Sequence, residues 1–166
     1  RIQSDLYMTE LDPRSPTTYT LVNETGIYYF SLNNLCRIIV DAITNQQGMF
    51  AEPLIAKNPY TNEPIKKSDL FNIYLCAKEQ RNIKISHFFE KFFMCEFNVF
   101  EFRRRHETEL RENAIKQYVK TTSISELYYD VHDMLSEHRM SKLINPDKEY
   151  PKQKFVLTMR PFLELY

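Results

Sequence analysis

Apolar and polar positions near the start of the chain predict a β-hairpin. Two runs rich in β-branched and aromatic side chains, residues 19–22 and 27–30, lie on either side of the sequence NETG. Gly26 closes that sequence and can take the positive φ that a tight turn needs. Strand-forming runs around a short turn with glycine are typical of antiparallel hairpins.

After the hairpin, the hydrophobic period becomes that of a helix. Ser31 is a favourable N-cap for a first helix and Ser68 for a second, and Asp69 lies where the helix dipole favours a negative charge. The first apolar stripe comprises Leu32, Leu35, Cys36, Ile39 and Ile43, and the second comprises Leu70, Ile73, Tyr74 and Ala77. Residues 49–67 contain Pro53, Pro59 and Pro64, so we expect an irregular segment between the two helices.

From Lys84 onward the chain has a helical pattern, and its first part is rich in aromatic residues. Residues 85–102 hold seven phenylalanines. A helix of this composition cannot be surrounded by solvent. We therefore expect it to be covered by its own domain or by a partner.

Further helical patterns complete the chain. One has a narrow apolar seam, and the next is capped by Ser123 or Ser125. The seam comprises Leu110, Ala114, Ile115 and Tyr118, and the inward face of the next helix comprises Leu127, Val131, Met134 and Leu135. We expect a short helix or an extended arm at 153–166, a short strand at 6–11 and a proline-marked loop at 144–152.

These elements predict an α+β fold in two parts. Residues 1–82 form a small module of hairpin, helix, loop and helix, and residues 83–166 form an aromatic-rich helical bundle packed on it. The chain of 166 residues begins with Arg1 and ends in the apolar run RPFLELY. We therefore expect it to be an ordered piece of a longer protein.

Composition narrows the classes of function. The 22 basic and 22 acidic residues cancel, so the global attraction to nucleic acid that a basic domain has is missing. No apolar run is long enough for a membrane-spanning helix. The chain has two glycines, whereas the glycine-rich loops that cradle phosphates need several. The scattered cysteines Cys36, Cys76 and Cys95 indicate reduced thiols in a reducing compartment.

The sequence predicts no catalytic group, metal site or cofactor. The histidines and cysteines lack the spacing that brings two ligands to one metal. Cys76 and Cys95 have apolar neighbours, which is typical of packed thiols and not of nucleophiles. We therefore favour a protein that is not an enzyme.

The one basic cluster comprises Arg103, Arg104 and Arg105. Arginine forks can bind phosphate or an acidic partner, which leaves a role in transcription or replication open. The spacings from Glu101 to Arg105 and from Glu107 to Arg111 also fit intrahelical ion pairs, so the alternative is a self-paired, solvated helix. We favour that alternative, and we do not expect nucleic acid as a partner.

The hairpin, first helix and proline segment together resemble a U-box, the zinc-free relative of the RING domain of ubiquitin ligases. The resemblance covers residues 12–80 and rests on the sequences TGIYYFSLNNLCRII and NPYTNEPIKKSDL. The matching positions are Thr25, Gly26, Tyr29, Asn58, Pro59, Thr61, Pro64, Ile65 and Leu70. It implies a fold of this type and a loop, with Tyr60, Asn62, Pro64 and Ile65, that meets a ubiquitin-conjugating enzyme or another protein.

One position of this loop departs from the U-box pattern. Asn62 stands where U-boxes usually carry an arginine that helps to position ubiquitin. This difference favours an architectural loop over a catalytic one. In that interpretation, Asn58 and Thr61 turn their side chains onto neighbouring backbone N–H groups and brace the loop as zinc braces a RING.

A second resemblance concerns lineage. Residues 19–135 are similar to uncharacterised proteins of nucleocytoplasmic large DNA viruses, with the same order of hairpin, NPYTN loop, Phe-rich helix and LRE helix. It implies a viral structural or assembly protein, a minor component of the capsid, found in the virion or in the host cytoplasm and viral factory. Its partners are then capsid or assembly proteins. A U-box-like ubiquitin-ligase module is the alternative.

Overall fold

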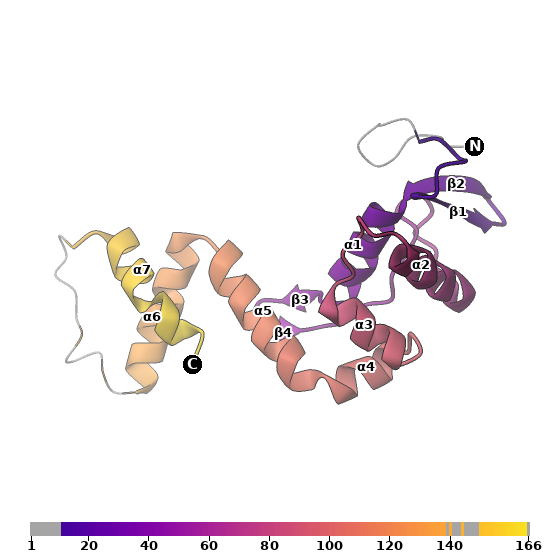
Figure 1. Ribbon diagram of the computed structural model, residues 1–166. Coiled ribbons are helices and arrows are strands. Elements are labelled where there is room, and N and C mark those ends of the chain that lie inside the picture. The colour runs from indigo at the N-terminus through magenta and orange to yellow at the C-terminus, as the bar shows by residue number, and fades with distance from the viewer. Residues whose placement is uncertain (1–10, 139, 141–143, 145–149, 166) are drawn as a thin grey trace. The chain divides into compact units, whose positions relative to one another are not determined.

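The computed structural model describes residues 11–138, 140, 144 and 150–165 of the chain (Figure 1). In this part of the chain, helices and two small antiparallel hairpins form an α+β fold, which confirms the predicted class. The strand expected at 6–11 and the loop expected at 144–152 lie largely outside the described residues.

The chain divides into two compact units. The first contains the chain up to Gln46 together with Ala51–Glu107, and the second contains Gln47–Phe50 together with the chain from Thr108 onward. The predicted hairpin, both predicted helices that follow it and the Phe-rich segment all belong to the first unit.

The predicted hairpin is formed by β1 (Thr18–Asn23) and β2 (Gly26–Ser31), and each strand is longer than predicted by one residue at either end. In the turn, the side-chain oxygen of Asn23 accepts hydrogen bonds from the backbone N–H of Gly26 at 3.1 Å and from the hydroxyl of Thr25 at 2.8 Å. Gly26 has a φ of 157°, which is positive as predicted. A side-chain amide therefore fixes the turn together with the glycine.

Helix α1 (Leu32–Ile43) buries all five residues of its predicted stripe. Ser31 occupies the N-cap position, but its side chain makes no capping hydrogen bond. The backbone N–H of Leu32 instead donates to the carbonyl of Thr17 at 2.9 Å. The start of the helix is thus tied to the chain that enters the hairpin.

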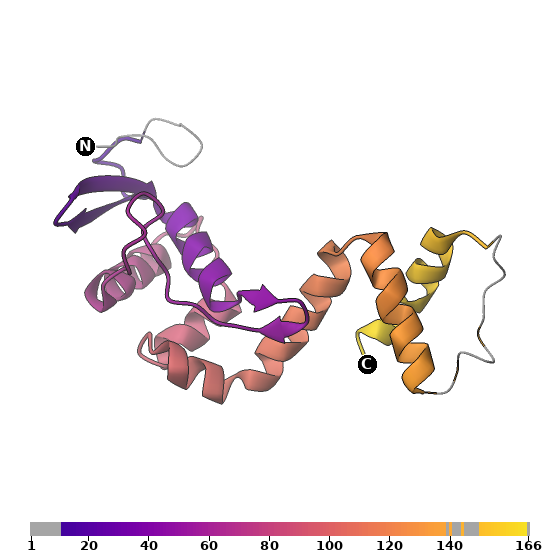
Figure 2. The same cartoon turned by 180° about the vertical axis from the view of Figure 1, so that it is seen from behind.

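A second hairpin, β3 (Gln46–Gln47) and β4 (Phe50–Ala51), follows α1 and was not predicted. Gly48 makes its turn, with a φ of 60°. The returning chain runs back along the end of α1, as Figure 2 shows, and the backbone N–H of Leu54 donates to the carbonyl of Ala42 at 2.8 Å. This contact fixes the position of the segment that leads to the NPYTNEP loop.

Helix α2 (Lys67–Glu79) begins before the predicted cap. Lys66 occupies the N-cap position and Ser68 lies inside the first turn, so the prediction that Ser68 caps this helix is wrong. The reason is that the backbone is already helical at Lys67, since the N–H of Leu70 donates to the carbonyl of Lys66 at 3.0 Å. Asp69 lies in the first turn as predicted, and the predicted stripe is buried.

The Phe-rich segment is not one helix, which corrects the prediction. It forms α3 (His87–Met94) and α4 (Val99–Arg105), joined by a tight turn. Glu96 and Phe97 have left-handed backbones, with φ of 49° and 58°. Such angles end a helix and usually belong to glycine or asparagine. The side chain of Asn98 then caps α4 by accepting a hydrogen bond from the N–H of Glu101 at 3.1 Å.

The first unit itself covers most of the aromatic segment. Phe93 stacks on Tyr74 of α2, with ring centroids 4.1 Å apart, and Phe97 meets Phe71 edge to face at 4.8 Å. The buried members are Phe89, Phe92, Phe97 and Phe102, none more than 7% exposed. The strained turn at Phe97 is therefore compensated by the burial of a large ring.

The second unit has its own hydrophobic core, made by α5 (Glu107–Thr121), α6 (Ile124–Glu137) and α7 (Lys152–Leu163). Ser123, one of the two predicted caps, forms a capping box with Glu126. The predicted inward face of α6 is buried, and the final segment is a helix. None of the described helices combines the length and the apolar character that crossing a membrane requires.

Candidate functional site

Residues 57–65 form a small hairpin-like loop between β4 and α2. Lys57 and Pro64 form an isolated antiparallel bridge, and the N–H of Asn58 donates to the carbonyl of Glu63 at 2.9 Å. The chain reverses at Asn62, which has a φ of 59° and whose N–H donates to the carbonyl of Asn58 at 2.8 Å. Asparagine adopts this left-handed conformation more readily than most residues with side chains. The backbone itself thus gives a reason for asparagine at position 62.

Two side chains brace this loop from inside, as predicted. Asn58 Oδ1 accepts a hydrogen bond from the N–H of Tyr60 at 3.0 Å, and Thr61 Oγ1 accepts one from the N–H of Glu63 at 3.3 Å. Asn58 is only 4% exposed, so its amide is held inside the unit. Buried polar groups that are bonded in this way fix one backbone geometry.

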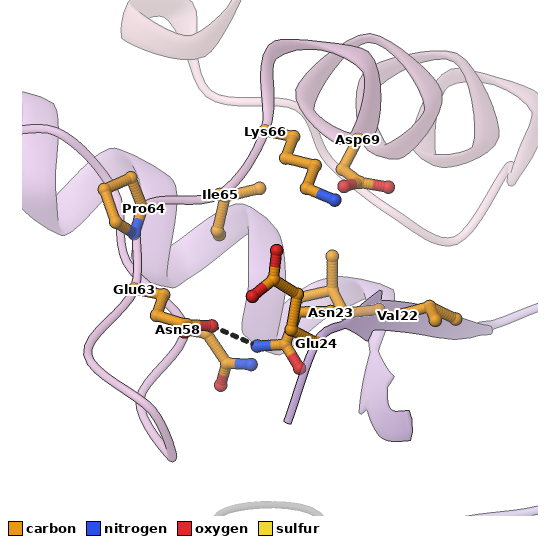
Figure 3. A pocket seen from close by; sticks show the side chains of 10 residues that line it. Val22, Asn23, Glu24, Asn58, Glu63, Pro64, Ile65, Lys66 and Asp69 are labelled. Carbon is orange, nitrogen blue, oxygen red and sulfur yellow. Dashed lines mark hydrogen bonds between the residues drawn. The ribbon is translucent and has the colours of Figure 1, made fainter. Parts of the chain in front are cut away.

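The loop is also anchored to the β1–β2 hairpin. The ring of Tyr60 stacks on Tyr28, with centroids 5.7 Å apart, and lies 5.4 Å from the ring of Phe30. The side-chain amide of Asn23 donates to the carboxylate of Glu63, as the dashed line in Figure 3 shows. Strand residues far away in the sequence therefore hold the loop in place.

A small pocket of about 240 Å³ lies where the hairpin, the loop and the start of α2 meet (Figure 3). Its lining carries the carboxylates of Glu24, Glu63 and Asp69 and the ammonium of Lys66. Asp69 accepts a hydrogen bond from the hydroxyl of Tyr19 at 3.0 Å. Burial, with Asp69 nearby, raises the pKa of Tyr19 to about 12, so the hydroxyl remains a donor at neutral pH. We interpret this pocket as a hydrogen-bonded seam between three elements.

A larger groove of about 1000 Å³ lies between the segment that follows β4, the 57–65 loop and α4. We call it the apolar groove; its apolar wall comprises Leu54, Ile55, Val99 and Phe100, and its floor includes Ile65 and Phe97. Ile65 and Phe97 are buried in its floor, each 7% exposed. Phe100 is 74% exposed, Ile55 56% and Leu54 47%. Exposed apolar side chains gathered at a concave surface are typical of binding sites.

The charges along the apolar groove have one sign. Lys57, Lys67 and Arg103 line it, and among the described residues no carboxylate does. The ammonium of Lys67 lies 3.3 Å from the carboxylate of Glu96, and both side chains are largely exposed. Within the described part of the chain, Arg103 makes no ion pair. The groove therefore presents a positive potential beside its apolar wall.

The other two arginines of the basic cluster are paired. Arg104 and Arg105 donate to the carboxylate of Glu101 at 2.9 and 3.2 Å, which confirms the predicted pair between Glu101 and Arg105. The other predicted pair is wrong, because Glu107 and Arg111 form no ion pair in the described part of the chain. The hydrogen bond from Arg104 is the main cause of the lowered pKa of Glu101. The basic cluster is thus divided: of its three arginines, only Arg103 lines the apolar groove.

The cysteines have the properties of packed thiols. Cys36 and Cys95 are buried, Cys76 is half-buried, and none of the three forms a disulfide. Burial raises the pKa of Cys36 to about 11 and also raises the pKa of Cys95. A thiol that keeps its proton at neutral pH is a weak nucleophile. Nowhere in the described part of the chain do three metal-ligating side chains gather.

The predicted loop residues take different positions. Asn62 and Ile65 line the apolar groove together with Arg103, so the structure brings two separately predicted features to one site. Pro64 is exposed beside the smaller pocket. Tyr60 packs against the hairpin of its own unit.

The sequence did not single out the exposed wall of the apolar groove. Leu54 and Ile55 form an apolar pair next to Pro53 in an irregular segment, and such a pair is a signal for an exposed binding loop. Phe100 lies two residues from the buried Phe102 on a short helix, so the two rings cannot share a face. The exposed position of Phe100 follows only once the Phe-rich segment is known to divide into α3 and α4.

Comparison with known proteins identifies no relative. No family model, curated protein or solved structure matches the chain.

Proposed function

We propose that the protein is a non-enzymatic assembly protein of a large DNA virus, a minor component of the capsid, and that it binds other proteins through the apolar groove. The observation that carries the binding role is the exposed wall formed by Leu54, Ile55 and Phe100 above a buried floor. The resemblance of residues 19–135 to proteins of these viruses supports the lineage.

Rigidity of the groove supports a role in binding. The backbone around Asn62 is fixed by hydrogen bonds to Asn58, and the segment with Leu54 is tied to α1 through Ala42. A surface that is already ordered loses little conformational entropy when a partner docks. The packed thiols with raised pKa values agree with a binding role and not with nucleophilic catalysis.

Purified virions provide the test. We expect the protein in particles at a fixed ratio to the capsid proteins, with chemical crosslinks from Lys57 or Lys67 to a neighbouring protein. A virus that carries Phe100→Ser should incorporate less of the protein, because the exposed ring is lost from the groove. Phe50→Ser is the matched control, since Phe50 is 80% exposed and does not line the groove. Presence in infected cytoplasm together with absence from particles would overturn the proposal.

The second candidate is a U-box-like ligase module. One observation favours it: the structure has a hairpin, a helix, a braced loop and a helix in the order that the resemblance implies, with the short β3–β4 hairpin between the first helix and the loop. An autoubiquitination assay with a panel of conjugating enzymes tests it. Asn62→Arg should raise activity, because it restores the residue that U-boxes usually carry, and Pro64→Ala should lower it. No ubiquitin chains from wild type or from Asn62→Arg would exclude this candidate.

A further inference from the structure

The charge and shape of the apolar groove indicate the kind of segment that it accepts. We propose that it binds a peptide segment of a partner protein in which aromatic or aliphatic anchors stand next to carboxylates. This inference rests on the proposed binding function and adds the chemistry of the partner. Its basis is the combination of an exposed apolar wall with Lys57, Lys67 and Arg103, and with no lining carboxylate among the described residues.

The apolar wall calls for large apolar anchors. Phe100 and Ile55 are more than half exposed, and Val99 lies beside them above the buried floor. An anchor that covers these side chains removes apolar area from water on both partners. Loss of one such ring from an interface costs roughly tenfold to a hundredfold in Kd.

The cations call for carboxylates beside those anchors. Arg103 makes no ion pair within the described residues. The ammonium of Lys67 lies 5.8 Å from the centroid of the Phe71 ring and forms a solvated pair with Glu96, which a partner carboxylate can replace. The amides of Asn62 and Asn98 also line the groove and can bond a peptide backbone.

A nucleic acid fits this surface less well than an acidic peptide. Arg104 and Arg105 are both held by Glu101, so the arginine cluster does not present three adjacent free guanidinium groups to a phosphate chain. The wall between the cations is aliphatic and aromatic, which suits side chains of a protein. An apolar acidic segment satisfies both the wall and the cations.

Selection from a display library of random 16-residue peptides on the full chain tests the proposal. We expect enriched peptides to combine two or more large apolar residues with an excess of Asp and Glu. Enrichment should disappear on Phe100→Ser and on Arg103→Glu. The matched controls are Phe50→Ser and Arg81→Glu, which change exposed residues that do not line the groove and should leave the selection unchanged.

The enriched peptide is then synthesised and titrated by fluorescence anisotropy. We expect Arg103→Glu to raise Kd about tenfold, because an attraction becomes a repulsion, and Phe100→Ser to raise it at least tenfold. Replacing the Glu residues of the peptide by Gln should weaken binding to wild type but should not weaken binding to Arg103→Glu, because there it removes a repulsion.

Several results would overturn the proposal: no enrichment above background, peptides without an acidic excess, or equal binding to Phe100→Ser. Self-association in sedimentation that is lost in Phe100→Ser would assign the groove to a second copy of the chain instead. Absence of the protein from virions would refute the assembly role and leave the peptide result standing, so the two failures can be told apart.

Discussion

Replacing Asn58 with alanine should open the 57–65 loop. The change removes the acceptor for the N–H of Tyr60, a bond of 3.0 Å, from a side chain that is only 4% exposed. A hydrogen bond of this kind contributes about 1 kcal/mol, and a buried donor left without a partner costs about 1–3 kcal/mol. We therefore expect the closed form of the loop to lose about 2 kcal/mol of stability relative to the open form. This loss corresponds to about a 30-fold rise in the equilibrium constant for opening.

Hydrogen exchange measured by mass spectrometry on peptides that cover residues 57–65 gives a direct assay. In Asn58→Ala, exchange of this segment should become about 30-fold faster. Exchange in α6 and α7, which belong to the other compact unit, should stay as in wild type. Far-UV circular dichroism checks that the helices remain folded.

Asn58→Ser is the matched control. A serine hydroxyl can accept the bond from the N–H of Tyr60, two residues further on, without adding a charge at a side-chain position that is only 4% exposed. We expect less than half of the effect of alanine. If alanine leaves exchange unchanged, or if serine acts as strongly as alanine, the side-chain bond does not brace the loop and the reasoning is refuted.

Three further predictions concern the first unit. Asn62 has a φ of 59°, which strains a β-branched side chain but not glycine. Asn62→Val should therefore lower the free energy of unfolding in urea by about 1–2 kcal/mol and Asn62→Gly by close to zero. Equal effects of the two substitutions would contradict this. Phe102→Ala, at a fully buried ring, should cost about 3–5 kcal/mol, whereas Phe100→Ala should stay within about 0.5 kcal/mol. Folding raises the pKa of the Cys36 thiol from 9.0 to about 11, because burial disfavours the thiolate. The contribution of this thiol to the free energy of unfolding is therefore complete below pH 9 and is lost as pH rises toward 11. Cys36→Ala should lose less stability over that range, and identical pH profiles would contradict the assignment.

Local patterns in the sequence predicted the elements whose signals are local. The stripes of α1 and α2 lie on one face because their spacing matches the helical repeat, and their buried residues are those predicted. The bonds from Asn58 and Thr61 could be predicted because both reach a backbone group two residues away. Asn62 was singled out by comparison with U-boxes, and the structure adds its left-handed backbone as a physical reason.

Features that depend on distant contacts could not be predicted. The break between α3 and α4 carries no glycine or proline, and its left-handed residue Phe97 is held by rings from α2 and α3. The apolar groove joins Leu54 to Phe100, which are 46 positions apart in the chain. Periodicity tells which residues avoid water, but it does not tell which exposed residues share a surface.

The bracing of the 57–65 loop makes its shape independent of metal and of thiol chemistry. The bonds from Asn58 and Thr61 use an amide and a hydroxyl, groups that neither a chelator nor a mild oxidant changes. A RING loop collapses when its zinc is removed or its thiolates are oxidised, because the metal and the sulfur are the braces. The NPYTNEP loop should keep its shape when metal is scarce and when the redox potential of its surroundings changes.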